Sequence, residues 1–367
     1  MHWLRRSFEI SHSNHPAIRS MEGLRGFAVF LVFLVHYVTL ISPWMSQSSI
    51  THQISLHLRN IGNAGVDMFF VLSGYLIYGM LVKRHRPFGP YISRRIQRIY
   101  PTFIAVFSIY LALSFIFPAE SKIPEPWFDA SIYVIQNILL LPGLFDIDPV
   151  ITVAWSLSYE VFYYLAIPLL ISGFSMHAWP SKARMFFFLL LSLLGFGYCY
   201  LYGGHVQLVM FLAGVLLYEF LASSLLKKAP PFGLIALALS ISSMLIIKEL
   251  SINGWWRYVA LYIFFFLLCW ECFSIEGFTS RLFSFAPLRW YGNMSYSYYL
   301  IHGLTLKGAF LFLGLAYPPS GDGVWMFWAF LPPMFLITLV VSATLFLMVE
   351  KPYSLARRSP ARKSVQA

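Results

Sequence analysis

Long apolar stretches recur from one end of the chain to the other, and the segments between them hold most of the charged residues. Ten stretches are long enough to cross a membrane as helices, since about 20 residues span the hydrocarbon core. They cover residues 23–42, 62–82, 100–117, 153–172, 185–202, 207–226, 232–250, 257–273, 294–314 and 325–349. The pattern predicts an all-α, polytopic membrane bundle of ten transmembrane helices. A further apolar run, residues 131–142, is too short to cross, so we expect a re-entrant or interfacial segment there.

The positions of Lys and Arg predict the orientation of this bundle, because cytoplasmic loops of membrane proteins hold most of the cations. With ten spans, 20 of the 26 Lys and Arg residues fall on one side of the membrane. That side includes both ends of the chain, so we expect both termini in the cytoplasm. The division that follows is a cytoplasmic N-terminal segment at residues 1–19, a membrane domain at 20–353 and a basic cytoplasmic tail at 354–367.

Composition agrees with a membrane protein and disfavours one that binds nucleic acid. Hydrophobic residues make up 59% of the chain and charged residues 11%, against about 25% charged in soluble domains. The net charge of +11 comes from cations scattered over the inner loops and not from one basic patch. Cys269 and Cys272 share a C-x-x-C spacing inside an apolar span, which we interpret as packing. We expect membrane lipids as neighbours, no nucleic acid and no metal.

Arg25 and His36 are the two strongly polar residues of the first span. They are eleven positions apart, so at about 100° per residue they lie on nearly the same side of a helix, about 16 Å apart along its axis. Ionisable side chains inside a bilayer are costly and usually mark a pathway, a ligand or a reaction. The pair predicts a cation near the cytoplasmic surface and a titratable imidazole deeper in one water-accessible passage. The alternative is a flanking charge and a histidine whose hydrogen bonds are satisfied within the bundle.

Asp67 lies near the outer start of the second span, at a depth similar to that of His36. A carboxylate beside an imidazole fixes its tautomer and raises its basicity. We therefore predict that Asp67 orients His36. The alternative is an interfacial aspartate exposed to water.

The densest basic segment is the inner loop between the second and third spans, where Arg94, Arg95 and Arg98 precede Pro101. Guanidinium groups bind phosphates through charge-assisted, bidentate hydrogen bonds. With Arg25 on the same side, the cluster predicts a site for the phosphates of an anionic cofactor. Attraction to anionic lipid head groups is the alternative.

Polar side chains also line two later spans. In the fourth span, Ser156, Glu160 and Tyr163 share one helical face, and a carboxylate within a span is expected in the bundle interior. In the ninth span, an interior polar stripe is predicted by Ser295, Tyr298, Tyr299, His302 and Thr305. Glu350 ends the tenth span at the inner surface, where it can pair with Arg25 or with the arginines of the inner loop.

Six stretches, in this order and spacing, resemble the acyltransferase 3 family of integral membrane acyltransferases. They are Glu-Gly-Leu-Arg-Gly with the Arg-x10-His spacing, Gly-Val-Asp-Met-Phe-Phe-Val-Leu-Ser-Gly, Arg-Arg-Ile-Gln-Arg-Ile-Tyr-Pro, Trp-Ser-Leu-Ser-Tyr-Glu, Ser-Tyr-Ser-Tyr-Tyr-Leu-Ile-His and Glu-Lys-Pro. The resemblance covers about residues 20–353, although Glu22 stands where the family more often has Asp. It implies ten helices and transfer of an acyl group, commonly acetyl, from cytoplasmic acyl-coenzyme A to a hydroxyl of a glycan or another envelope molecule.

The residues and the resemblance together lead to the hypothesis of a membrane O-acetyltransferase in a bacterial inner (plasma) membrane, acting on a glycan or lipid-linked glycan. The residues expected to hold acetyl-coenzyme A are Arg25, Ser73, Arg94, Arg95, Arg98 and Glu350. His36, oriented by Asp67, is the expected general base, while Glu160 and His302 are assigned to acceptor positioning or proton transfer. Direct transfer and a transient acyl-imidazole are both open routes. The alternative function is a transporter or flippase that uses the same buried ionisable residues.

Overall fold

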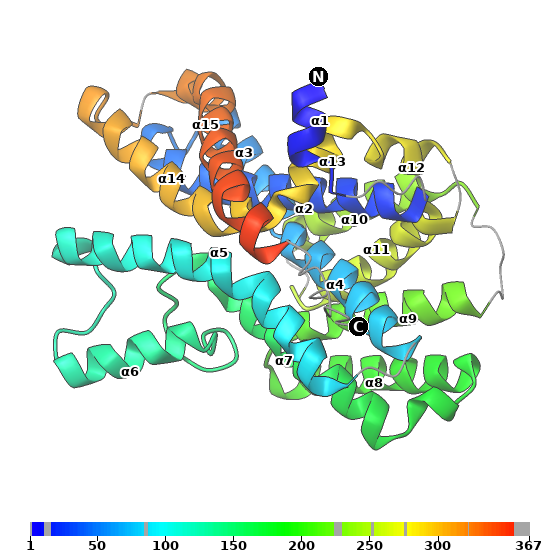
Figure 1. Ribbon diagram of the computed structural model, residues 1–367. Coiled ribbons are helices and arrows are strands. Elements are labelled where there is room, and N and C mark those ends of the chain that lie inside the picture. Colours follow the sequence, from blue (N-terminus) through cyan, green and yellow to red (C-terminus); the bar gives the residue numbers. More distant parts are fainter. Residues whose placement is uncertain are drawn as a thin grey trace.

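The computed structural model describes residues 2–10, 16–83, 87–223, 230–250, 253–274, 277–321 and 323–355. Its helices are α1 (His2–Phe8), α2 (Pro16–Ile41), α3 (Ile50–Gly62), α4 (Ala64–Val82), α5 (Phe88–Ile116), α6 (Trp127–Ile138), α7 (Trp155–Gly173), α8 (Ser181–Tyr202), α9 (Gln207–Ala222), α10 (Gly233–Glu249), α11 (Trp256–Ser274), α12 (Phe278–Phe283), α13 (Ala286–Asn293), α14 (Ser295–Ala316) and α15 (Val324–Leu345). Short 3₁₀ turns lie at η1 (Ser42–Trp44), η2 (Pro118–Glu120), η3 (Thr152–Ala154) and η4 (Met176–Ala178), and a π-helical segment, η5 (Phe346–Ser354), continues α15. The predicted all-α architecture is confirmed for this part of the chain (Figure 1).

Eight helical stretches of the described chain are long and apolar enough to cross a membrane. They are Ile18–Trp44, Ile50–Val82, Phe88–Ile116, Thr152–Gly173, Ser181–Tyr202, Trp256–Ser274, Ser295–Ala316 and Val324–Ser354. Helices α9 and α10 occupy the two other predicted spans but have only 16 and 17 residues. The protein thus has the helices of a multi-pass membrane protein, while the count of ten spans and the cytoplasmic termini stay predictions. Most of the predicted basic tail, residues 356–367, lies outside the described residues.

Three segments differ from the sequence-based expectation. Helix α5 begins at Phe88 and continues through Pro101, so the arginines predicted to lie in a loop form the first turns of a 29-residue helix. The predicted outer loop 43–61 contains α3, whose first turn is capped by the Ser49 hydroxyl, which accepts a hydrogen bond from the His52 backbone N–H. The short apolar run forms α6, which begins and ends four residues before the predicted boundaries, 131 and 142.

Helix α2 is the most buried of the membrane-length helices, and it packs against α3, α4, α11, α12, α13 and α14. Of its most apolar 18 residues, 61% are buried, against 17% for α8, which borders the bundle. The functional residues predicted on α2 therefore lie at the centre of the helical bundle, whereas α6 lies beside α5 at its edge (Figure 1).

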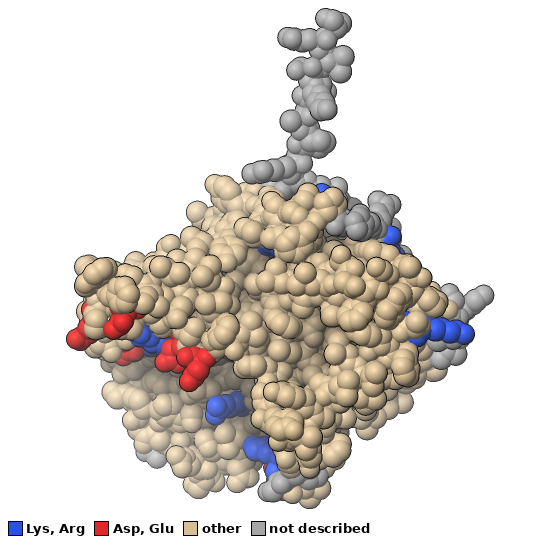
Figure 2. Space-filling model, turned by 90° about the horizontal axis from the view of Figure 1, so that it is seen from below, with Lys and Arg blue, Asp and Glu red and all other residues tan. Residues whose placement is uncertain are grey.

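The edge of the molecule around α6 is acidic, in contrast to the largely uncharged surface of the other helices. Its exposed carboxylates are Glu120, Glu125, Asp129, Asp146 and Asp148. Figure 2 shows acidic side chains gathered at one edge of a face on which basic side chains are scattered and most of the area carries neither. The largely uncharged surface fits lipid contact, since ionisable side chains are costly in hydrocarbon.

Glycines allow α4 and α9 to approach until their backbones touch. In the α4 and α9 pair, a Cβ atom at Gly74 would collide with the carbonyl oxygen of Phe211, and one at Gly214 with that of Val71. Small residues favour such close packing of helices in membranes, where the hydrophobic effect does not drive association.

We expect Gly74→Ala to lower the free energy of unfolding by about 1–3 kcal/mol, the usual cost of overpacking a well-packed core. The added methyl group has no space beside the Phe211 backbone. Thermal unfolding in detergent, followed by tryptophan fluorescence, measures the change. Gly308→Ala on α14 is the matched control because nothing lies within 4 Å of its Cβ position; equal unfolding midpoints for the two variants would contradict the prediction.

Candidate active site

A cavity of about 150 Å³ lies among α2, α4, α5, α7 and α14. Five of the ten residues predicted as functional line it: Arg25, Ser73, Arg95, Arg98 and Glu160. They come from four helices that are distant in the sequence. The remaining polar lining is hydroxyl-bearing, from Ser156, Tyr164, Ser295, Tyr296 and Tyr299.

Two guanidinium groups of the cavity have no carboxylate within 4 Å among the described residues. Arg25 donates a hydrogen bond to the Ser295 hydroxyl, with Nη2 to Oγ 3.1 Å. Arg95 lies over the rings of Tyr91 and Tyr164, at 5.4 and 5.1 Å from their centroids, and its Nε is buried without a hydrogen-bond partner in this part of the chain. Buried donors that lack partners favour an anionic ligand with several acceptor oxygens, such as a phosphate.

Arg98 differs from these two because its charge is already balanced by Glu350. Its Nη1 lies 2.6 Å from Glu350 Oε1, and Glu350 also accepts hydrogen bonds from the backbone N–H and hydroxyl of Ser297, at 2.9 and 2.5 Å. The fully buried carboxylate thus joins η5 to α14 and α5. The structure pairs Glu350 with an arginine of the basic segment, one of the two pairings open from the sequence.

Arg94 is exposed and does not line the cavity, unlike its neighbour Arg95. One residue turns a helix by about 100°, so consecutive side chains on α5 point in different directions. The predicted grouping of Arg94 with the three other arginines is therefore not found in the cavity. The residue remains available only at the surface of the helix.

On α7, Glu160 faces the cavity together with Ser156, as the spacing predicted. The carboxylate accepts a hydrogen bond from the Tyr164 hydroxyl, and Ser156 Oγ lies 2.7 Å from Tyr299 Oη. The expectation for Tyr163 is wrong, because its hydroxyl donates to the carbonyl of Leu208 on α9, 2.7 Å away. Tyr164, four residues after Glu160, takes the place predicted for Tyr163.

The polar stripe of α14 lies inside the protein, as predicted for most of its members: Ser295, Tyr298, Tyr299 and His302 are buried. His302 lies against His36 of α2, with ring centroids 4.9 Å apart and the rings at 71°. Arg25 also contacts Ser295, so polar side chains of α2 and α14 meet at two places along these helices.

His36 itself is half-buried and is not among the residues that line the cavity. The predicted single passage lined by both Arg25 and His36 is thus divided: Arg25 faces the cavity, and His36 lies beyond it. Tyr299 connects the two regions, because it lines the cavity and its ring centroid is 6.2 Å from that of His302.

Asp67 is buried, and no hydrogen bond or ion pair joins it to His36. Its Oδ1 has no hydrogen-bond partner among the described residues, and the cation that interacts with it electrostatically is Arg257 of α11. Gly65, two residues earlier, faces α2, and two residues turn a helix by about 200°. Asp67 therefore points away from α2, so the contact required for it to orient His36 is absent.

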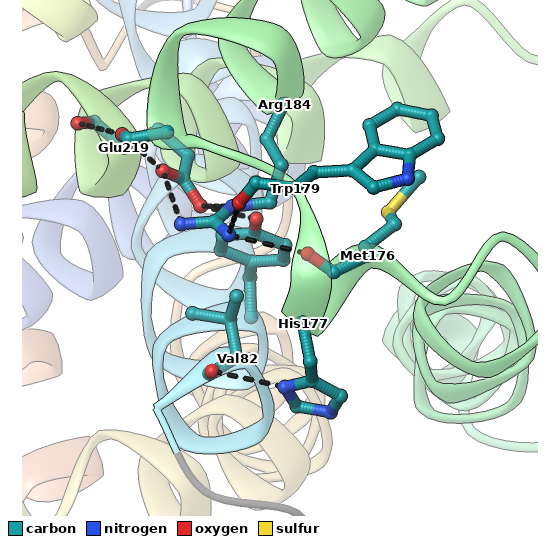
Figure 3. Close-up of polar contacts among 8 residues, drawn as sticks. Val82, Met176, His177, Trp179, Arg184 and Glu219 are labelled. Atoms are coloured by element: carbon teal, nitrogen blue, oxygen red, sulfur yellow. Dashed lines mark hydrogen bonds and ion pairs between the residues drawn. The ribbon is translucent and has the colours of Figure 1, made fainter.

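Two buried clusters of ion-paired side chains at helix ends were not predicted from the sequence. Arg184 of α8 donates to Glu219 of α9, with Nε to Oε1 2.6 Å, and to the carbonyls of Met176 and Trp179 (Figure 3). Glu219 also accepts hydrogen bonds from Tyr78 and Ser181. The sequence signal was a carboxylate in an apolar span and an arginine at the start of another, but their pairing follows only from the packing of α8 on α9.

The second group fixes the first turns of α2. Arg289 of α13 bonds Glu22, with Nε to Oε2 2.8 Å, and also Glu9 after α1. Burial alone would raise the pKa of Glu9, but hydrogen bonds from Trp290 and Arg289 outweigh it and lower that pKa. These contacts give Glu22, part of the first sequence motif, a structural role.

The chain is similar to several bacterial proteins over part or most of its length. It is 27% identical over 194 residues to O-acetyltransferase OatA of Staphylococcus aureus, covering 48% of this chain and 28% of the relative. It is 24% identical over 379 residues to YrhL of Bacillus subtilis, named as a proposed peptidoglycan O-acetyltransferase, covering 92% and 55%. An uncharacterized protein of Haemophilus influenzae is 34% identical over 119 residues, covering 29% and 48%.

The chain spans about half the length of these relatives, or less. No solved structure matches it significantly. The model of the family described as "Acyltransferase domain" matches residues 18–347, which include every helix that contributes to the cavity and the histidine pair. The chain therefore belongs to this acyltransferase family, the acyltransferase 3 family that its sequence motifs indicated.

Proposed function

We propose that the protein is a membrane O-acyltransferase that moves an acyl group, acetyl in the simplest case, from cytoplasmic acyl-coenzyme A to a hydroxyl group of a cell-envelope glycan. The observation that carries the proposal is the cavity, in which neither Arg25 nor Arg95 forms an ion pair with a carboxylate of the described chain. An anion with several acceptor oxygens would satisfy both groups at once.

The donor end of the proposed site consists of Arg25, Arg95 and Arg98, with Ser73 on the facing helix. Guanidinium groups suit the phosphates of coenzyme A because they donate in a planar fork and remain charged at all physiological pH values. Arg98 contributes less net charge than the other two, since Glu350 balances it. In this arrangement the phosphates remain at the arginines, and the thioester arm extends past Tyr299 toward His36.

The proposed chemistry requires one proton acceptor and no redox partner. The acceptor hydroxyl loses its proton to a ring nitrogen of His36 while its oxygen attacks the thioester carbonyl carbon. The carbon–sulfur bond breaks, the acyl group stays on the oxygen, and the departing thiolate takes the proton from His36. Histidine suits this role because its unperturbed pKa lies near neutral pH. Glu160, which lines the cavity, is the candidate for positioning the acceptor.

The acceptor is proposed from the relatives' names, which include a peptidoglycan O-acetyltransferase. A glycan or lipid-linked glycan offers hydroxyl groups at the outer side of a bacterial inner membrane. The distribution of Lys and Arg supports the corresponding topology, with the basic segment of α5 on the cytoplasmic side.

The direct test uses purified protein in lipid nanodiscs with acetyl-coenzyme A labelled in the acetyl group. We expect release of free coenzyme A, detected with a thiol reagent, and transfer of label to an added peptidoglycan fragment or lipid-linked glycan. The transporter alternative predicts binding or movement of a solute without cleavage of the thioester. Protein that is folded and binds acetyl-coenzyme A, but neither cleaves the thioester nor transfers label, would overturn the proposal.

A further inference from the structure

His302 is held in one tautomer by the helix that carries it. Its Nδ1 lies 2.9 Å from the backbone carbonyl oxygens of both Tyr298 and Tyr299. A carbonyl oxygen only accepts hydrogen bonds, so Nδ1 must be the protonated nitrogen. In the neutral ring, Nε2 is then a hydrogen-bond acceptor with a fixed direction.

This acceptor nitrogen is buried and has no hydrogen-bond partner among the described residues. A buried polar atom without a partner costs about 1–3 kcal/mol, so such an atom calls for an explanation. The ring of His302 cannot turn away without losing both bonds to the carbonyls, and stacking on Tyr298, with centroids 5.3 Å apart, further limits it.

The imidazole ring next to His302 is that of His36. The centroids are 4.9 Å apart and the planes are inclined by 71°. Ring nitrogens lie on the edge of the imidazole, and the separation of the centroids leaves room for a hydrogen bond between one nitrogen of each ring when the His36 side chain rotates. His36 has freedom for that rotation because its ring makes no hydrogen bond to another described residue, and the charged group that interacts with it electrostatically is the cation Arg59 of α3, not a carboxylate.

We propose that His302 is the positioning residue of the reaction: its Nε2 accepts the N–H of His36 and thereby leaves the other His36 nitrogen unprotonated toward the acceptor hydroxyl. His302 would supply the orienting contact that Asp67, which faces away from α2, does not provide. The proposal rests on the proposed function, because it assigns His302 to the base of that same reaction. The protons balance: the His36 proton shared with His302 stays in place, and the proton taken from the acceptor hydroxyl enters and leaves through the second ring nitrogen of His36.

The test compares His302→Gln, whose side-chain oxygen can replace the Nε2 acceptor, with His302→Leu, which fills the space without an acceptor. We expect His302→Leu to lower kcat about 10- to 100-fold, less than the roughly 10⁴-fold that follows loss of a charged orienting partner, because His302 is neutral. The KM for acetyl-coenzyme A should stay within about threefold of the wild-type value. The kcat of His302→Gln should be at least about tenfold higher than that of His302→Leu. Equal thermal unfolding midpoints establish that both variants are folded.

A double variant gives a readout that a packing role would not produce. Because His302 acts through His36, the pair His36→Ala and His302→Leu should be no slower than His36→Ala alone. The inference is overturned if the kcat of His302→Leu stays within threefold of the wild-type value, or if His302→Gln has the same kcat as His302→Leu. It is also overturned if the fold-losses in kcat of His36→Ala and His302→Leu multiply in the double variant. Failure of the proposed function is a separate result: His36→Ala would then have normal turnover, or the wild-type protein would not cleave the donor.

Discussion

His36→Ala is expected to lower the turnover of acyl transfer at least about 100-fold, because general-base catalysis contributes about 10²- to 10⁴-fold. The imidazole is half-buried near the centre of the bundle and makes no hydrogen bond to another described residue, so it is free to accept a proton. The arginines of the cavity are not altered, so the KM for acetyl-coenzyme A should remain within about threefold. Steady-state release of coenzyme A and transfer of label to the acceptor measure both constants.

His57→Ala is the matched control for this substitution. His57 lies on α3, is also half-buried and is paired loosely with Glu249, at 3.8 Å. We expect normal turnover from this variant and equal amounts of both variants in the membrane. Near-normal turnover of folded His36→Ala would refute the assignment of His36 as the base.

Arg95→Gln should raise the KM for acetyl-coenzyme A about 10- to 100-fold while leaving kcat nearly unchanged. A hydrogen bond to a charged group contributes about 1.5–3 kcal/mol, and about 1.4 kcal/mol corresponds to a tenfold change in affinity. The Arg95 side chain reaches the cavity between two tyrosine rings and has a buried donor without a partner in the described chain. Affinity can be measured directly from the displacement of labelled acetyl-coenzyme A.

Arg94→Gln separates a specific donor site from general attraction to anions. It removes the same charge from the next residue of α5, but Arg94 is exposed and outside the cavity. We expect its KM to change less than about threefold. An equal increase in KM for Arg94→Gln and Arg95→Gln would mean that the basic segment acts through its overall charge, as it would toward anionic lipid head groups.

The positions of the helices could be predicted from the sequence because a span must bury its backbone polar groups within its own hydrogen bonds, which requires long apolar runs. The start of α5 could not be predicted, since the apolar run alone places the beginning of the third span at residue 100. Proline removes one backbone donor, yet α5 continues through it from Phe88 to Ile116.

Within one helix, spacing predicted which residues share a face, as for Ser156 and Glu160. It could not predict which faces meet. Arg25 and Ser295 are 270 residues apart, and their contact depends on how α2 packs on α14. The same limit explains Asp67: its depth in the span suggested His36 as a partner, but the rotation of α4 about its axis is determined by the contact of Gly65 with α2.

The crossing of α2 and α13 limits the motion of the helix that carries Arg25 and His36. Cβ atoms at Gly26 and Gly292 would collide with backbone atoms of the opposite helix, and Arg289 clasps Glu22 one turn away. Because the two backbones are in direct contact, α2 can neither shift along its axis nor rotate about it without separating from α13. The backbone positions of Arg25 and His36 are consequently fixed by this packing, while the side chain of His36 keeps its freedom to rotate.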